Sequence, residues 1–365
     1  MSNPVPERLL ELFRPAVRAE RPYIVPGARP VSVKLNQNES PFDLPPAMKR
    51  ELLEAFFQID FNRYPSEQPT RLIQALESRC GVEAGSVLVG NGSNELTYTL
   101  GLCFVGEGDA VITPTPMFAL YESMVRLHGG RPVQVECADD FQVDTDAVLV
   151  AIEEHQPKLV ILATPNNPTG LAIPKSDIER IVRAAPGFVV VDEAYHEFNP
   201  EGSSLDLLMR QPNVIILRTL SKAFGLAGLR LGYLVARPQV VAEMMKSRLP
   251  FMVDRLAEQV GLLLLRHQDL IHDRVQQIKI YTAQLKESLE TMPQVKDVLA
   301  SDTNFILFRT DRDATELLGE LADHDVLVRN MGGYSQLQGY LRVTSGTPSE
   351  NKAFLDALAL VLRQF

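Results

Sequence analysis

Lys222 has the surroundings that best suit covalent chemistry. It follows an apolar, strand-like run (214–217) and lies in the segment Ser221-Lys222-Ala223-Phe224-Gly225-Leu226-Ala227-Gly228-Leu229-Arg230. On its own, a lysine at a strand-to-helix turn is more often an exposed surface residue. A lysine amine can form a Schiff base with an aldehyde when its surroundings lower its pKa. Small neighbours allow close approach of a ligand, and Ser221 and Arg230 can hold a phosphate beside the amine.

A second candidate is the carboxylate of Asp192. It directly follows the apolar run 188–191 and begins the segment Asp192-Glu193-Ala194-Tyr195. An aspartate at such a place often only caps a helix or a turn. Pyridoxal 5'-phosphate (PLP), however, combines an aldehyde, a phosphate and a pyridine nitrogen. A carboxylate that keeps this nitrogen protonated allows the ring to absorb the electrons of a carbanion. Asp192 upstream of Lys222 therefore indicates a PLP site.

Two turn-rich segments follow other apolar runs and supply further polar groups. Residues 166–170, Asn-Asn-Pro-Thr-Gly, can simply close a strand. Residues 90–95, Gly-Asn-Gly-Ser-Asn-Glu, open a helical pattern and lack the third glycine of a dinucleotide fingerprint. A helix N-terminus offers free N–H groups and a positive dipole end, so this second segment can cradle a phosphate.

Together these segments resemble the PLP-dependent aminotransferases of fold type I. The resemblance implies that Lys222 carries the cofactor and moves the proton, and that Asp192 holds the ring nitrogen. Tyr195 and Asn167 would bind the phenolate oxygen of PLP. The catalytic residues would be Lys222, Asp192 and Tyr195, and the phosphate would be held by Gly92, Ser93, Asn94, Ser221 and Arg230.

Aromatic residues extend the resemblance. The family places an aromatic ring against the pyridine face, and Phe118 matches that position, with Tyr121 as the other candidate. Phe118 could equally be ordinary helix core. Tyr64, followed by Pro65, matches a tyrosine that reaches the cofactor phosphate of the other subunit. The resemblance therefore implies a homodimer with shared active sites.

The C-terminal part contains two arginines suited to an anionic substrate. Arg342 lies in Leu341-Arg342-Val343-Thr344-Ser345-Gly346-Thr347-Pro348, and Arg329 follows Val328. With Asn38 in Leu35-Asn36-Gln37-Asn38-Glu39-Ser40-Pro41, they resemble the histidinol-phosphate aminotransferase branch. That branch departs from this chain at Ser40, where asparagine is common, and around Phe118. Arg329, Arg342, Asn38 and Tyr64 would then contact the substrate.

The branch implies amino transfer between L-histidinol phosphate and 2-oxoglutarate, which gives imidazole acetol phosphate and L-glutamate in histidine biosynthesis. Two other enzymes use the same cofactor set: an aromatic or broad-specificity aminotransferase, and a lyase resembling threonine-phosphate decarboxylase. A non-catalytic binding protein is a further alternative, although all the expected cofactor-binding residues are present. The fold alone does not decide among these functions.

The elements that must position these residues alternate in type along the chain. Seven short apolar runs are separated by helical patterns, as expected for strands buried on both faces of a parallel sheet: 86–89, 110–112, 132–136, 159–162, 188–191, 214–217 and 231–235. We expect the α/β fold of fold type I PLP-dependent transferases, with a mostly parallel seven-stranded sheet flanked by helices. Ligands of such sheets lie beyond the carboxyl ends of the strands.

The predicted organisation is an N-terminal arm (1–30), a large PLP-binding domain (31–245) and a smaller α+β domain (246–365). The arm should hold an amphipathic helix within 1–20 and an extended linker with Pro22, Pro26 and Pro30. A long helical stretch is expected over 240–289, broken near Pro250.

Composition excludes several other classes. The 365 residues carry a net charge of −10, so there is no basic surplus for nucleic acid. Cys80, Cys103 and Cys137 lack metal-ligand or disulfide spacing, which favours free thiols in a reducing cytoplasm. The histidines show no metal-ligand pattern. We see neither a signal peptide nor an apolar run of membrane-spanning length, so no metal, nucleic-acid or membrane partner is expected.

Overall fold

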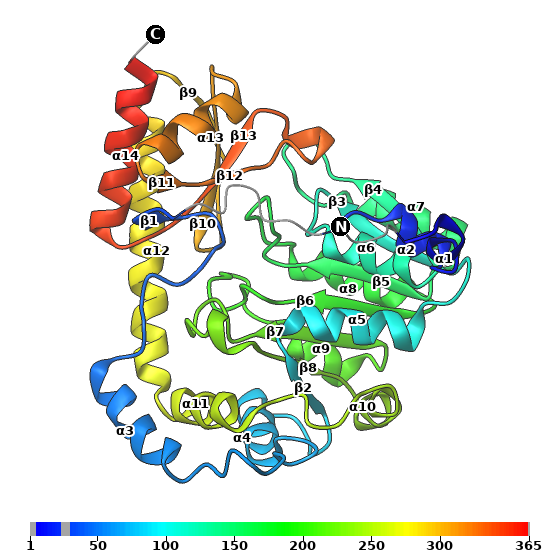
Figure 1. The fold of residues 1–365 in the computed structure, drawn as a ribbon. Coiled ribbons are helices and arrows are strands. Elements are labelled where there is room, and N and C mark those ends of the chain that lie inside the picture. The colour runs from blue at the N-terminus through cyan, green and yellow to red at the C-terminus, as the bar shows by residue number, and fades with distance from the viewer. Residues whose placement is uncertain (1–4, 23–29, 364–365) are drawn as a thin grey trace.

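The computed structural model describes residues 5–22 and 30–363. A large sheet covered by helices lies beside a smaller sheet, and the long helix α12 (Gln268–Glu290) runs from the first part to the second (Figure 1). This arrangement confirms the predicted α/β class. Within the described residues, no helix is both long and apolar enough to cross a bilayer.

The large sheet contains the seven predicted strands, in the spatial order β2-β8-β7-β6-β5-β3-β4. Only β8 runs antiparallel to its neighbours. The other six strands therefore end at one common edge, where the side chains that follow them can converge. The strands are β2 (Val87–Asn91), β3 (Ala110–Thr115), β4 (Arg131–Glu136), β5 (Leu159–Ala163), β6 (Phe188–Asp192), β7 (Val214–Thr219) and β8 (Leu231–Val235).

Helices bury both faces of this sheet, which explains why its strands are apolar throughout. One face is covered by α5 (Ser93–Phe104), α6 (Leu120–Leu127) and α10 (Pro238–Met245). The other face is covered by α4 (Thr70–Cys80), α7 (Thr145–His155), α8 (Lys175–Ala184), α9 (Leu205–Arg210) and α11 (Arg255–Arg266), and α3 (Pro46–Phe56) packs on the outside of α11. Aspartates begin two of them, because Asp144 and Asp254 accept hydrogen bonds from the first turns of α7 and α11.

The C-terminal part is built on a four-stranded antiparallel sheet in the order β12-β13-β10-β9. Its strands are β9 (Val295–Val298), β10 (Phe305–Thr310), β12 (Arg329–Asn330) and β13 (Tyr340–Thr344). Its core includes α12, α13 (Ala314–Asp323) and α14 (Pro348–Arg363). Early in the chain, β1 (Val33–Lys34) pairs with β11 (Val326–Leu327) of this same part. The domain limits given above stay a prediction.

The N-terminal segment differs from the single helix expected within 1–20. Two short helices form instead, α1 (Glu7–Leu10) and α2 (Pro15–Ala19). Pro15 explains the break, because proline suits the first turn of a helix but cannot continue one. The linker predicted around Pro26 lies mostly outside the described residues. The break predicted near Pro250 lies between α10 and α11, and a second break at His267, which was not predicted, separates α11 from α12.

Candidate active site

A cavity of about 670 Å³ lies at the carboxyl edge of the large sheet, where β12 and β13 of the smaller sheet approach it. Most of the residues singled out from the sequence line it. They are Asn38, Ser93, Asn94, Phe118, Asn167, Asp192, Tyr195, Ser221, Lys222, Arg230, Arg329 and Arg342. Residues more than 300 positions apart in the chain thus meet in one space, as the doubly wound topology predicts.

Lys222 occupies the loop that follows β7. Its Nζ donates a hydrogen bond to the backbone oxygen of Gln37 at 3.0 Å and lies 5.8 Å from the ring centre of Tyr195. Burial lowers the pKa of this amine to about 7, helped by the positive charges of Arg342 and Arg230. Near neutral pH much of the amine is therefore unprotonated, which is the form that acts as a nucleophile or a base.

Asp192 ends β6 and points its carboxylate into the buried wall of the cavity. Its Oδ2 accepts a hydrogen bond from the Tyr121 hydroxyl at 2.7 Å, and its Oδ1 accepts one from the Ala194 N–H at 3.0 Å. Burial raises the pKa of the carboxyl to about 6, and the two hydrogen bonds oppose that rise. Such a carboxylate would be stabilised by a cationic ring nitrogen placed beside it.

Tyr121 differs from the neighbouring Phe118 because its hydroxyl donates a hydrogen bond to Asp192. Tyr121 is fully buried, and its ring meets Phe118 edge-on, with 6.4 Å between ring centres. Phe118 is only partly buried and also lines the cavity. Because Phe118 is partly exposed to the cavity, whereas the Tyr121 hydroxyl is bonded to Asp192, we propose that Phe118 takes the stacking position.

Gly92, Ser221 and Arg230 form a cradle at the N-terminus of α5. Gly92 has a φ of 81°, and a Cβ at this position would lie 2.3 Å from Nη2 of Arg230. Only glycine therefore lets the guanidinium pack against the turn that begins the helix. Arg230 Nη1 in turn lies 3.5 Å from Oγ of Ser221. A cation beside a helix N-terminus makes a strong anion site.

Arg329 and Arg342 lie directly opposite each other, because β12 and β13 pair in the register Arg329↔Arg342. Paired residues of antiparallel strands project to the same face. Both arginines line the cavity, and Arg342 also hydrogen-bonds the side-chain oxygen of Asn167 and the backbone oxygen of Asn36. Two positive charges directly opposite each other on paired strands repel, which destabilises the pairing. An anion bound between the two guanidinium groups would offset this repulsion.

Asn38 connects the two parts of the molecule at the cavity. Its Nδ2 donates to the Tyr195 hydroxyl at 2.9 Å, and its backbone N–H donates to Oγ1 of Thr344 in β13 at 2.9 Å. Its φ of 54° lies in the left-handed region, which asparagine tolerates better than most residues. The direct contact is with Tyr195, so Asn38 is placed to orient that hydroxyl, a role the sequence did not suggest.

Two predicted site residues do not line this cavity: Gly92, which directly precedes the lining residue Ser93, and Tyr64. The Tyr64 side chain is 78% exposed and stacks on Phe251, with 4.8 Å between ring centres. Its role at the cofactor of the other subunit stays a prediction.

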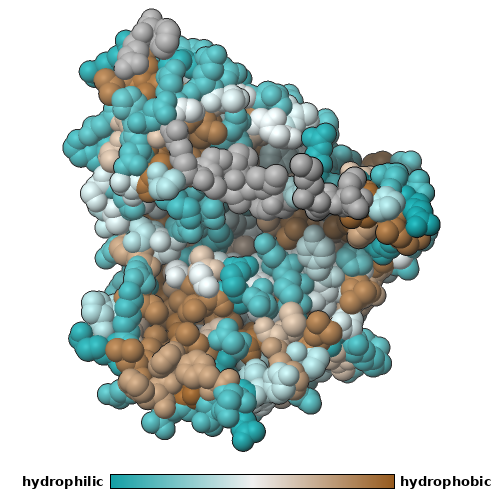
Figure 2. Space-filling model, in the orientation of Figure 1, coloured by the Kyte–Doolittle hydropathy of each residue, from teal (hydrophilic) through white to brown (hydrophobic). Residues whose placement is uncertain are grey.

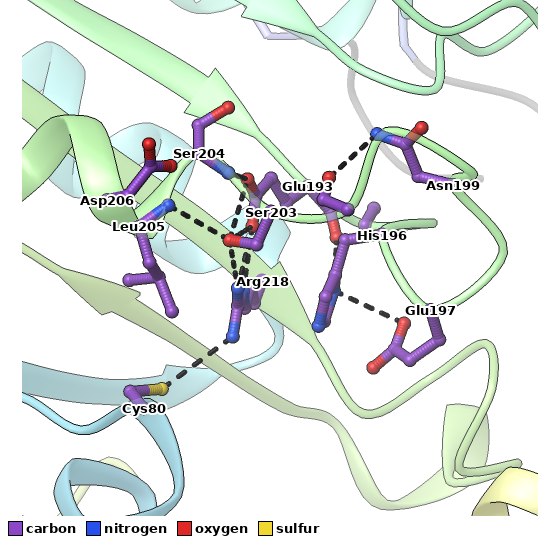
Figure 3. A network of polar contacts seen from close by, with 12 residues as sticks. Cys80, Glu193, His196, Glu197, Asn199, Ser203, Ser204, Leu205, Asp206 and Arg218 are labelled. Atoms are coloured by element: carbon purple, nitrogen blue, oxygen red, sulfur yellow. Dashed lines mark hydrogen bonds and ion pairs between the residues drawn. The ribbon is translucent and has the colours of Figure 1, made fainter. Parts of the chain in front are cut away.

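Sequence reasoning missed a buried ion pair behind Asp192. The side chain of Glu193, the next residue, accepts hydrogen bonds from Arg218 Nε and Nη2 at 3.0 and 2.8 Å (Figure 3). Ser203 donates to the same carboxylate and accepts a bond from Arg218. The pair joins the ends of β6 and β7, which lead to Asp192 and Lys222. The only sequence signal was the presence of charged residues at two strand ends.

Comparisons with known proteins agree with this geometry. Residues 30–358 match the model of the family described as aminotransferase class I and II. The histidinol-phosphate aminotransferase of Chlorobaculum tepidum is 40% identical over 95% of this chain and 99% of its own length. That of Chlorobium phaeobacteroides is 40% identical over 96% of this chain and 97% of its own.

A solved structure of a protein with the same name is also similar to this chain. The crystal structure of histidinol-phosphate aminotransferase from Sinorhizobium meliloti in complex with pyridoxal-5'-phosphate superposes with a TM-score of 0.89. It is 28% identical in sequence, and the match covers 97% of this chain and 98% of that one.

Proposed function

Because the chain belongs to the aminotransferase class I and II family, we propose that it transfers the amino group of L-histidinol phosphate to 2-oxoglutarate with PLP as cofactor. The products are imidazole acetol phosphate and L-glutamate, and the step belongs to histidine biosynthesis. Relatives named histidinol-phosphate aminotransferase, similar over nearly the whole chain, support this substrate. The structural observation that carries it is the facing pair of Arg329 and Arg342 in the cavity that holds Lys222.

The residues of the cavity fit PLP. The cradle of Gly92, Ser221 and Arg230 suits its phosphate, and the buried Asp192 carboxylate suits its ring nitrogen. The Lys222 amine suits its aldehyde. When bound, PLP supplies an electron sink for the bond that breaks at the substrate carbon.

The chain's own residues then have distinct tasks in the reaction. Lys222 would remove the proton from Cα of the substrate and deliver it to C4' of the cofactor, for which an amine with a pKa near 7 is well matched. Asp192 would keep the ring nitrogen of the cofactor protonated. Tyr195 and Asn167 would donate hydrogen bonds to its phenolate oxygen, and Asn38 holds the Tyr195 hydroxyl in place.

The two arginines determine the choice of substrate. Histidinol phosphate has no carboxylate, so its phosphate takes the position between Arg329 and Arg342. In the other half-reaction, 2-oxoglutarate and glutamate present carboxylates to the same cations. A dianion gains most from two planar donors, because each charged hydrogen bond contributes about 1.5–3 kcal/mol.

Replacement of the arginines tests this assignment. We expect Arg342→Ala to impair both half-reactions, because Arg342 also holds Asn167. Arg329→Ala should lower kcat/KM for histidinol phosphate about 10- to 100-fold and affect phenylalanine much less. Steady-state kinetics with both amino donors measure the difference, and Arg309→Ala in the neighbouring strand β10 is the matched control. An equal loss for both donors after Arg329→Ala would remove it from phosphate recognition.

The active unit is proposed to be a homodimer in the cytoplasm, where three unpaired cysteines stay reduced. The exposed Tyr64–Phe251 stack lies near other exposed apolar side chains of the α3 region, namely Leu53, Phe56, Phe57 and Phe61. In Figure 2 the surface at lower left, where Figure 1 shows α3 and α11, is largely hydrophobic. Burial of such a surface favours association.

Mixed dimers test the shared site. Lys222→Ala and Tyr64→Phe chains are each expected to be impaired alone. When they are mixed after partial unfolding and reassembly, one site of each heterodimer carries both changes and the other carries neither, so part of the activity should return. Activity against mixing ratio is the measurement. A monomer by sedimentation at micromolar concentration, or no recovery, would contradict the shared site.

A further inference from the structure

Glu95 stands in the first turn of α5, whose N-terminal residues Ser93 and Asn94 line the cofactor cavity. A carboxylate in a first turn is favourable for the helix itself, because it complements the helix dipole. It is unfavourable for a bound phosphate dianion, which the same N-terminus is proposed to hold, since the two negative charges repel each other. The site must therefore compensate for Glu95.

The Glu95 side chain folds back from the cavity. Its Oε2 accepts a hydrogen bond from the Asn91 N–H at 3.2 Å, and its Oε1 accepts one from Oγ1 of Thr99 at 2.8 Å. A Cβ on Gly90 would lie 2.4 Å from Oε2, so the glycine leaves room for this conformation. In this position Oε2 also lies 3.0 Å from Nη1 of Arg248.

Arg248 reaches Glu95 from the segment that follows α10, and its side chain is only 1% exposed. Burial lowers the pKa of its guanidinium, and the Glu95 charge opposes that effect. Within the part of the chain that the structure describes, Nε and Nη2 have no hydrogen-bond partner. Burying a guanidinium whose N–H donors lack partners destabilises the fold. Packing alone therefore does not explain why an arginine occupies this position.

We propose that Arg248 is a positioning residue for the cofactor phosphate: it neutralises and retracts Glu95, so that the N-terminus of α5 presents N–H donors to the phosphate without an opposing carboxylate. This inference rests on the proposed PLP function. It predicts how the affinity for the phosphate changes when the charges of Arg248 and Glu95 are removed. Loss of the Arg248 charge weakens phosphate binding through Glu95, and loss of both charges restores it.

Calorimetric titration of the full-length apoenzyme with pyridoxamine 5'-phosphate measures this dependence without turnover and without a covalent bond to Lys222. Arg248→Met should weaken binding about tenfold, which corresponds to about 1.4 kcal/mol. Arg248→Lys should keep most of the affinity. Glu95→Gln should bind as tightly as the wild type or more tightly, and the Glu95→Gln/Arg248→Met double variant should return to within about threefold of the wild type.

Pyridoxamine, which lacks the phosphate, is the matched ligand control and should bind all variants alike. A double variant as weak as Arg248→Met, or a Glu95→Gln variant weaker than the wild type, would overturn the proposal and leave Arg248 with a packing role. If Arg248→Met does not fold, as judged by near-ultraviolet circular dichroism, the sign of the Glu95→Gln effect still decides. Failure of the wild type itself to bind pyridoxamine 5'-phosphate would instead refute the proposed function.

Discussion

Replacement of Lys222 by alanine is expected to reduce the rate of amino transfer by about 10²- to 10⁴-fold or more, the usual contribution of a positioned general base. Among residues 5–22 and 30–363, no other lysine lines the cavity, so no second lysine amine of this set can take over the proton. Binding of pyridoxamine 5'-phosphate should persist, because the cradle of Gly92, Ser221 and Arg230 is intact. Single-turnover absorbance measurements give the rate.

Lys246→Ala is the matched control, because Lys246 is exposed and pairs only with Glu243 at the surface of α10 among the described contacts. Borohydride reduction followed by peptide mapping should label Lys222 in the wild type. A label on another lysine, or near-normal turnover in Lys222→Ala, would refute this mechanism.

The pKa of Lys222 adds a pH dependence. Because the neutral amine is the reactive form and burial lowers its pKa from 10.5 to about 7, the rate at which the apoenzyme takes up PLP should rise as pH increases through about 7. It should then level off above about pH 8. A rise centred near pH 10 would show that the amine is not desolvated.

Asp192→Asn should have the second largest effect. A neutral amide cannot hold the ring nitrogen protonated, so proton removal at the substrate carbon should slow by about 10²- to 10³-fold, as for the loss of one preorganised electrostatic partner. PLP should still bind through the phosphate cradle and Lys222. Single-turnover rates and cofactor content measure the two properties separately.

Tyr121→Phe is the graded control for Asp192. It keeps the carboxylate but removes the hydrogen bond that holds the carboxyl pKa down, so that pKa should rise further. Its expected effect is smaller than that of Asp192→Asn and greatest at low pH, where more of the carboxyl becomes protonated. Near-normal single-turnover rates in Asp192→Asn would exclude the residue from this role.

The sequence predicted the large sheet well, because strands buried on both faces must be apolar throughout. It could not predict the order of the strands. That β8 lies between β2 and β7 and runs antiparallel to both depends on tertiary pairing, which leaves no local pattern. Pro15 marks the break in the N-terminal helix. The prediction of one helix followed the amphipathic pattern of 1–20 and gave too little weight to this proline.

The site, too, was predictable from the sequence in some parts and not in others. Lys222, Asp192 and Asn167 follow strands that end at one edge, so their convergence followed from the topology. The facing of Arg329 and Arg342 depends on the register of two short antiparallel strands, and one residue of slip would have turned one of them away. Contacts between distant segments, such as Arg248 with Glu95, have no counterpart in sequence spacing.

The most direct test mixes the PLP-loaded enzyme with single amino donors in the absence of a keto acid. Conversion of the cofactor to its pyridoxamine form, followed by absorbance, gives kcat/KM for each half-reaction. The account predicts that L-histidinol phosphate reacts with the highest value, well above unphosphorylated histidinol and phenylalanine, and that threonine phosphate releases no carbon dioxide. A preference for phenylalanine, or decarboxylation of threonine phosphate, would contradict it.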